Sequence, residues 1–407
     1  MTPTKRLTRL VVIVLLTIGL PLQLSAQNPN IAPSTSTPDS ATNAATGWIL
    51  TPAVSVSTAW DDNVFVQGAG DEGTGDLVNT INPRLSANYD GRRSAFNLNY
   101  SGAFLLYREL SELDSFDQRL SMSARQRLTR HATWFVENAF AAVPTTELSG
   151  LVGVPFVRTG SKLEDFRSGV DVAVSKRTSL AFVGNFQWIS FDNDPTFASQ
   201  LHGGQGIGGE GSLRHQITAH TTLLADYRYQ FAHISETGET FAVQTTEGGL
   251  EHRFSSLVTA YAQGGIARLD ATVVGQSRIG PSIRAGVTRR DTRSSIQASY
   301  SRTFVPSYGF GGTTQNEELL GSVMVPFARR WYGNAATAFR RNEPLTFGQP
   351  SLRSFWFEGS IGYDLNGMAQ IEGFFGGAHQ IVDRPGGVVN RNRIGVQVVT
   401  SKRMRIH

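Results

Sequence analysis

Apolar and polar residues alternate along many segments of this chain. In residues 221–231, TTLLADYRYQF, every second position is apolar, and the positions between are mostly polar or charged. Successive side chains of a β-strand point to opposite faces, so this alternation predicts a strand with one dry face and one wet face. Residues 94–104, 115–128 and 278–288 carry the same pattern, and no stretch after Trp48 shows a clear helical period.

Short polar breaks separate the alternating segments at regular intervals. They are centred near residues 91, 130, 177, 219, 255, 291, 329 and 366, with spacings of about 36 to 47 residues. Asp90-Gly91 and Asn366-Gly367 are strong signals for two-residue hairpin turns. Longer breaks that contain glycine and acidic residues lie between the short ones, for example at 61–76, 144–162, 192–204 and 342–350. The chain is therefore predicted to alternate short turns with longer loops.

The predicted strands are long, about 11–14 residues, whereas strands of soluble domains have ~5–6 residues and tilted membrane-crossing strands need ~9–11. A propeller would need shorter strands, and a soluble sandwich would seldom show such long polar rows on the second face. In lipid, only closure of the sheet pairs every backbone group. We therefore predict an all-β fold, a transmembrane antiparallel up-and-down β-barrel of about 18 strands, with 16 as the alternative count. Aromatic residues near the strand ends are expected to form girdles at the headgroups, namely Trp60, Tyr107, Trp134, Trp188, Phe191, Phe304, Trp331 and Phe355.

The N-terminal residues read as an export signal. A basic start with Lys5, Arg6 and Arg9 is followed by an apolar run and by small residues around Ala26, which predicts a signal peptide at residues 1–26. Residues 27–47 are rich in Pro, Ser, Thr, Asn and Ala and are predicted to be a disordered periplasmic leader, followed by the barrel at 48–407. Removing three basic residues lowers the formal charge from +4 to about +1, which argues against nucleic-acid binding.

Two segments resemble a known family. Residues 57–65, STAWDDNVF, and residues 82–101, NPRLSANYDGRRSAFNLNYS, are similar to the putative β-barrel porins of Gram-negative outer membranes. The resemblance implies an outer-membrane barrel, and some members of such families are associated with exopolysaccharide secretion. Barrels of this kind often end on an aromatic residue that aids their assembly, whereas this chain ends SKRMRIH.

The polar face of the predicted strands is expected to line the interior. Its predicted pore-lining residues are Arg84, Arg119, Arg125, Arg127, Arg167, Arg214, Arg228, Arg253, Arg284, Arg293, Asp117, Asp171, Glu210, Asp226, Glu251 and Glu358, together with Asp165, Glu247, Glu318 and Arg393. Two interpretations remain open. The charges form a wall of ion pairs that keeps a wide barrel rigid and wet, or an arginine surplus favours anionic or sugar-like solutes.

Candidates for other chemistry are weak. Asp61, Asp62 and Asp71 could supply oxygen ligands to Ca²⁺, but they lack the spacing of a known calcium loop. The chain has no cysteine, and its histidines have no serine or aspartate partner at an informative spacing. We therefore expect no enzyme activity, no metal site and no cofactor.

The leading hypothesis is a porin-like outer-membrane channel that passes small polar, anionic or sugar-like solutes without chemistry. The alternatives are an accessory barrel for exopolysaccharide export and a non-conducting structural or adhesion barrel. The expected partners are outer-membrane lipid and lipopolysaccharide, the barrel-assembly machinery and polysaccharide, with no nucleic acid.

Overall fold

The computed structural model describes residues 47–68, 73–146, 153–192, 201–235, 237–271, 277–345, 348–383 and 387–406. The predicted signal peptide and leader lie outside these residues, apart from Gly47, which begins the first strand. Within the described ranges, no helix is long and apolar enough to cross a membrane.

Long strands make up almost all of the described chain, and the first eighteen have 12 to 15 residues each. They are β1 (Gly47–Asp61), β2 (Asp76–Asp90), β3 (Ser94–Tyr107), β4 (Ser115–Arg127), β5 (Ala132–Val143), β6 (Ser161–Ala173), β7 (Thr178–Phe191), β8 (Gly204–Gln216), β9 (Thr221–Ile234), β10 (Thr240–Arg253), β11 (Val258–Ala271), β12 (Ser277–Arg290), β13 (Ser295–Pro306), β14 (Thr313–Pro326), β15 (Trp331–Pro344), β16 (Leu352–Asp364), β17 (Ala369–Val382), β18 (Val388–Ser401) and β19 (Met404–Ile406). A 3₁₀ turn, η1 (Ser111–Leu113), lies between β3 and β4.

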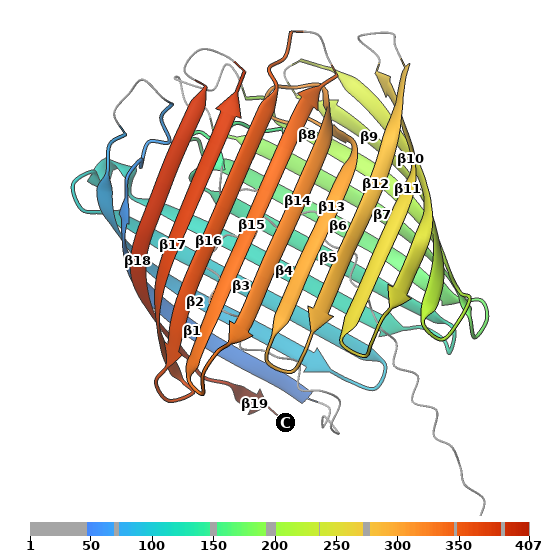
Figure 1. Ribbon diagram of the computed structural model, residues 1–407, viewed down its shortest axis with the longest axis horizontal. Coiled ribbons are helices and arrows are strands. Elements are labelled where there is room, and N and C mark those ends of the chain that lie inside the picture. Colours follow the sequence, from blue (N-terminus) through green and yellow to red (C-terminus); the bar gives the residue numbers. More distant parts are fainter. Residues whose placement is uncertain are drawn as a thin grey trace, which may run out of the picture.

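Each strand pairs antiparallel with the next, and the sheet closes where β18 pairs with β1 (Figure 1). The short β19 follows β18 and pairs with the first part of β1, at Trp48–Leu50. β18 and β19 thus share one place in the wall, which has 18 strands. The predicted closed antiparallel barrel is confirmed with 18 strands, and the alternative of 16 is wrong.

The two ends of the barrel differ in their connections. Eight turns of three or four residues join the strands at one end, which we call the turn end. Nine connections of five or more residues, which include the 17 residues between β5 and β6, lie at the other end, which we call the loop end. The predicted alternation of short turns and longer loops is therefore confirmed. In outer-membrane barrels the short turns face the periplasm and the longer loops face outward.

The two faces of the wall differ as the alternation predicts. On β9, Tyr227 and Tyr229 are 48% and 41% exposed on the outer face, while Asp226 and Arg228 project to the inner face and make polar contacts there. The predicted aromatic girdle is partly right, since Trp60, Trp134, Trp188, Trp331 and Phe355 are exposed. The prediction is wrong for Tyr107, Phe191 and Phe304, which pack against apolar clusters at the loop end.

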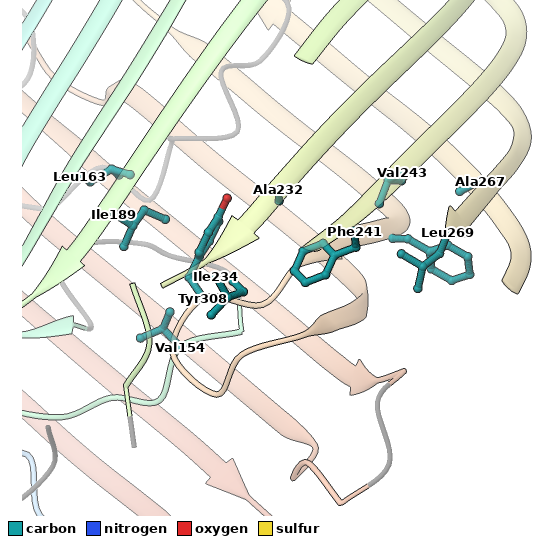
Figure 2. Packing of buried hydrophobic residues seen from close by; sticks show 11 residues of the cluster. Val154, Leu163, Ile189, Ala232, Ile234, Phe241, Val243, Ala267, Leu269 and Tyr308 are labelled. Carbon is teal, nitrogen blue, oxygen red and sulfur yellow. The ribbon is translucent and has the colours of Figure 1, made fainter. Parts of the chain in front are cut away.

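An apolar cluster lies inside the barrel at the loop end (Figure 2). We call it the inner apolar cluster, and its buried members are Val154, Leu163, Ile189, Ala232, Ile234, Phe241, Val243, Ala267, Leu269, Phe304 and Tyr308. Most of them alternate along β6–β11 with outward residues, so they share a face with the polar residues nearer the turn end. The inner face is therefore polar in its middle and apolar near the loop end.

Candidate functional site: the inner face of the barrel

The structure places the predicted pore-lining residues on the inner face, with one exception. Those on strands alternate with exposed apolar residues and project to the interior. Arg293 instead lies in the exposed turn between β12 and β13, where the alternation of a strand does not apply. Its assignment to the wall is therefore corrected.

Sequence reasoning missed several charged residues of the same face. Asp61, Glu137, Arg340, Glu372 and Arg391 all project inward from strands. Glu137, Asp61 and Glu372 sit in segments that are less regularly alternating, and Asp61 had been weighed only as a metal ligand. With these residues included, acidic side chains on the inner face are about as numerous as arginines. The predicted arginine surplus is therefore not a property of the inner face.

The densest polar contacts on this face join β9, β10 and β12. Glu247 accepts hydrogen bonds from Arg228 Nη2 at 2.9 Å, Arg284 Nε at 2.6 Å and Ser282 Oγ at 2.5 Å. The carboxylate thus holds two guanidinium groups and one hydroxyl from both sides of its own strand. Charge-assisted bonds of this kind are stronger than neutral ones. They tie neighbouring strands together across the inner face.

Asp226 extends this network around the wall. Arg284 Nη2 lies 3.1 Å from Asp226 Oδ2, and Gln263 of β11 donates to the same oxygen. Asp226, Arg228, Glu247, Gln263, Ser282 and Arg284 form what we call the β9–β12 network. Four adjacent strands contribute to it, so the network acts as a polar belt on one side of the interior.

Further ion pairs cover other parts of the inner face. Arg340 Nε lies 2.5 Å from Glu318 Oε1, and Arg119 Nε lies 3.2 Å from Asp117 Oδ1. Three other pairs are longer, with Arg125 and Arg167 each 3.8 Å from one oxygen of Glu137, and Arg214 3.7 Å from Glu251. The structure therefore favours the interpretation of a wall cross-linked by ion pairs.

Across the barrel from the β9–β12 network, Glu372 of β17 accepts several hydrogen bonds. Its Oε1 accepts from Ser360 Oγ at 2.8 Å and from Asn334 Nδ2 at 3.3 Å, and Gln397 donates to Oε2. Three strands, β15, β16 and β18, thus contact one carboxylate of β17. The nearby Glu358 projects to the same face and is partly exposed.

A buried ion pair lies where the barrel closes. Arg391 of β18 donates from Nη2 to Asp61 Oδ2 of β1 at 2.5 Å, and its Nε contacts both oxygens at 3.0 and 3.1 Å. The two side chains are 4% and 1% exposed. Next to this pair, Asn392 donates from its backbone and side chain to the carboxylate of Asp62. Asp61 and Asp62 are thus engaged in closing the sheet.

Residues 153–158, which precede β6, fold into the barrel. The Phe156 amide donates to Gln380 Oε1 of β17 at 2.6 Å, although β17 is not a neighbour of β5 or β6. Arg158 donates to the Val64 carbonyl at 3.0 Å, to the Tyr107 hydroxyl at 3.1 Å and to the Leu113 carbonyl at 2.7 Å. Residues 153–158 therefore cross the inside of the loop end and narrow it.

A second inward segment meets the first. Ser307 Oγ donates to the Gly153 carbonyl at 3.4 Å, and Gly309 and His202 exchange two backbone hydrogen bonds at 2.8 and 2.9 Å. Tyr308 and Val154 both belong to the inner apolar cluster (Figure 2). Burial raises the pKa of the Tyr308 hydroxyl, so this group stays protonated at physiological pH.

The remaining candidates for chemistry lie apart from one another. His215 and His252 project outward and contact Thr178 and Thr221, respectively. Among the residues described, no three His, Asp or Glu side chains are grouped to hold a metal ion. Asp71, the third of the weak metal candidates, lies outside the described residues.

Comparisons with known proteins agree with this architecture. The model of the family described as putative beta-barrel porin 2 matches residues 39–197. No curated protein matches the chain by sequence.

Three of the similar solved structures are outer-membrane proteins of other bacteria. OccAB3 of Acinetobacter baumannii is 10% identical, with a TM-score of 0.42 and coverage of 87% of this chain and 99% of that chain. The outer membrane protein opdK of Pseudomonas aeruginosa is 9% identical, with a TM-score of 0.43 and coverage of 87% and 99%. OccAB4 of A. baumannii is 7% identical, with a TM-score of 0.44 and coverage of 88% and 99%. The resemblance predicted from the sequence is confirmed over residues 39–197, the part of the chain that the family model matches.

Proposed function

We propose that this barrel is a passive channel that carries small polar solutes, including anionic and sugar-like ones, across the outer membrane. The observation that carries the proposal is the inner face, which is lined by charged and amide side chains over most of its height, while the outer face is apolar. A polar interior surrounded by a lipid-facing apolar band is the arrangement of water-filled barrels.

The distribution of charge indicates weak rather than strong ion selectivity. Acidic and basic side chains are balanced and mostly paired, so no large field of one sign favours anions or cations throughout the interior. Some guanidinium groups are only loosely paired. One nitrogen of Arg125 and one of Arg167 each lie 3.8 Å from an oxygen of Glu137, so their other N–H groups can donate to the carboxylate or hydroxyl of a passing solute. Selection by size is expected from residues 153–158, which narrow the loop end. No step of this function requires a catalytic group.

Swelling of vesicles tests the proposal. Vesicles of phosphatidylcholine that contain the folded protein should swell in small neutral sugars faster than in tetrasaccharides, because the inward loop limits solute size. Heat-modifiable gel mobility should verify that the protein is folded in the same vesicles. Folded protein that leaves the swelling rate equal to that of empty vesicles would contradict the proposal.

A further inference from the structure

The wall is incompletely paired between β12 and β13. These strands pair only from Ile283–Arg302 to Arg290–Ser295, whereas β11–β12 and β13–β14 pair along almost their whole length. In the part of the chain that the structure describes, residues 277–282 of β12 and 303–306 of β13 therefore have no backbone pairing across this seam. Figure 1 shows β12 rising beyond β13 at the loop end, with the two strands diverging.

The sequence at the seam explains why the pairing stops. Pro281 lies within the unpaired part of β12, and Pro306 ends β13. Proline has no N–H to donate to a ladder and is confined to edges, strand ends and bulges. Each of the two facing segments thus contains a residue that cannot complete a continuous ladder.

The end of β13 lies inside the barrel rather than beside β12. β13 approaches β10 and β11, which are not its neighbours in the sheet. Phe304 is 4% exposed and packs with Phe241 of β10 and Leu269 of β11 in the inner apolar cluster. A Cβ atom at Gly280 would lie 2.5 Å from the Phe304 ring, so this glycine permits the ring to fill the space behind β12.

Apolar side chains lie on both sides of the seam, next to charged residues on its outer side. Ile279 is 68% exposed on the outer face, where its neighbour on β11 is the exposed Arg268 and Ile283 lies beside Arg302 of β13. Behind Ile279 lie Phe304 and the inner apolar cluster, in a barrel whose inner face is otherwise polar. At the base of the seam, Ser282 Oγ lies 3.2 Å from Thr303 Oγ1. Ile279 outside and the Phe304 ring inside are therefore the apolar groups that border the seam.

We propose that the seam between β12 and β13 is a lateral portal through which the acyl chain of a single-chain amphiphile passes from the outer leaflet to the inner apolar cluster. The loop end of an outer-membrane barrel lies at the level of the outer leaflet. Contact with Ile279 and then with the inner apolar cluster removes the surface of an acyl chain from water, which favours its passage. Phe304 closes the portal, and a chain that enters takes the place of its ring.

A disulfide across the base of the seam tests the portal. The chain has no cysteine of its own, so the double variant Ser282→Cys with Thr303→Cys carries one thiol pair, and the 3.2 Å between the native hydroxyl oxygens suits a bond. The matched control is Thr288→Cys with Gln297→Cys, two residues that pair in the closed part of the same seam. Both variants are placed in phosphatidylcholine vesicles with dodecanoic acid that carries a photoactivatable diazirine.

We expect the reduced Ser282/Thr303 variant to be labelled at residues 303–308 and 267–269, and oxidation to abolish this labelling. Oxidation of the control pair should leave the same labelling unchanged. Labelling that persists when the seam is locked, or that is confined to the outer belt around Leu319 and Phe339 in both states, overturns the portal. Conductance of the same vesicles tests the proposed channel function separately. If the protein conducts but its interior is not labelled, the channel function stands and only the portal is disproved.

A second variant protects the test from a failure of the cysteine pair to fold. Phe304→Ala removes the closing ring and should increase labelling of residues 267–269, whereas Phe339→Ala removes a ring that is exposed on the outer face and should not. Equal labelling of the two variants would also overturn the portal.

Discussion

Arg228 of β9 makes a diagonal ion pair with Glu247 of β10 on the inner wall, with Arg228 Nη2 2.9 Å from Glu247 Oε2. The residue before Arg228, Tyr227, is exposed on the opposite face. One step along the strand therefore separates a lipid-facing ring from an ion pair, and substitutions at the two positions should have different consequences.

Tyr227→Arg should lower the free energy of unfolding in vesicles. Tyr227 lies at the centre of β9, and an arginine that faces lipid at the bilayer midplane costs ~2–4 kcal/mol. Urea titration followed by heat-modifiable gel mobility measures the change, with Tyr227→Phe as the control that keeps the ring. An arginine variant as stable as the phenylalanine variant would show that this face is not in lipid.

Glu247→Gln should shift the reversal potential toward anions, because it removes one negative charge from the inner face and leaves Arg228 and Arg284 without their shared carboxylate. The substitution should also lower the free energy of unfolding. Removing one partner of a fully buried ion pair costs about 3–5 kcal/mol, and the decrease here should be smaller because Arg228 is partly exposed. Glu251→Gln is the control, since its contact with Arg214 is 3.7 Å long. The same shift in both variants would mean that Glu247, within the β9–β12 network, affects ion selectivity no more than an acidic residue outside the network.

Arg158→Ala should raise single-channel conductance. Arg158 holds residues 153–158 through three hydrogen bonds to other parts of the loop end, and without them only the weaker contacts of Phe156 and Gly153 keep this segment in the interior. Arg108→Ala changes an exposed arginine in a neighbouring loop and should leave conductance unaltered. If Arg158→Ala conducts like the native protein, the loop does not limit the pore.

The pair Asp61–Arg391 should show strong coupling in a double-mutant cycle. Both side chains are almost fully buried at the closure of the sheet, and contacting residues of this kind couple by about 0.5–3 kcal/mol. The exposed pair Arg268–Asp270 is the control and should couple by less than ~1 kcal/mol. Equal coupling free energies in the two cycles would mean that the Asp61–Arg391 pair stabilises the closed sheet no more than an exposed pair does.

The alternation of residue types was sufficient to predict the wall. On β4, Arg119 and Arg125 face inward while Phe116 faces outward, as the sequence pattern indicates. A strand's two faces depend on neighbouring residues only, so local sequence carries this information. The number of strands followed from the turns for the same reason, since Asp90-Gly91 and Asn366-Gly367 lie at hairpins between adjacent strands.

The inward loops could not be predicted in this way. Phe304 has the same alternation as the outward residues of β13 but turns into the inner apolar cluster. Tyr107 lies at an inward position of β3, where Phe104 and Leu106 face out, and the Arg158 guanidinium lies over its ring at 5.0 Å. Both contacts join residues that are far apart in the chain, so no local period reports them. Pro281, in contrast, was a visible signal, because a proline inside an alternating segment marks a place where a ladder is interrupted.

The outer face of each strand meets lipid and the inner face meets water. Substitutions at Tyr229 and Gln230, two successive residues of β9, test this arrangement directly. Tyr229 is exposed outside, and Gln230 is the next residue on the inner face. Because the chain has no cysteine, Tyr229→Cys and Gln230→Cys can be compared in planar bilayers with a charged, membrane-impermeant thiol reagent. We expect a stepwise change of single-channel current for Gln230→Cys and none for Tyr229→Cys. The opposite pattern, or folded protein that conducts no current, would show that the two faces are assigned wrongly.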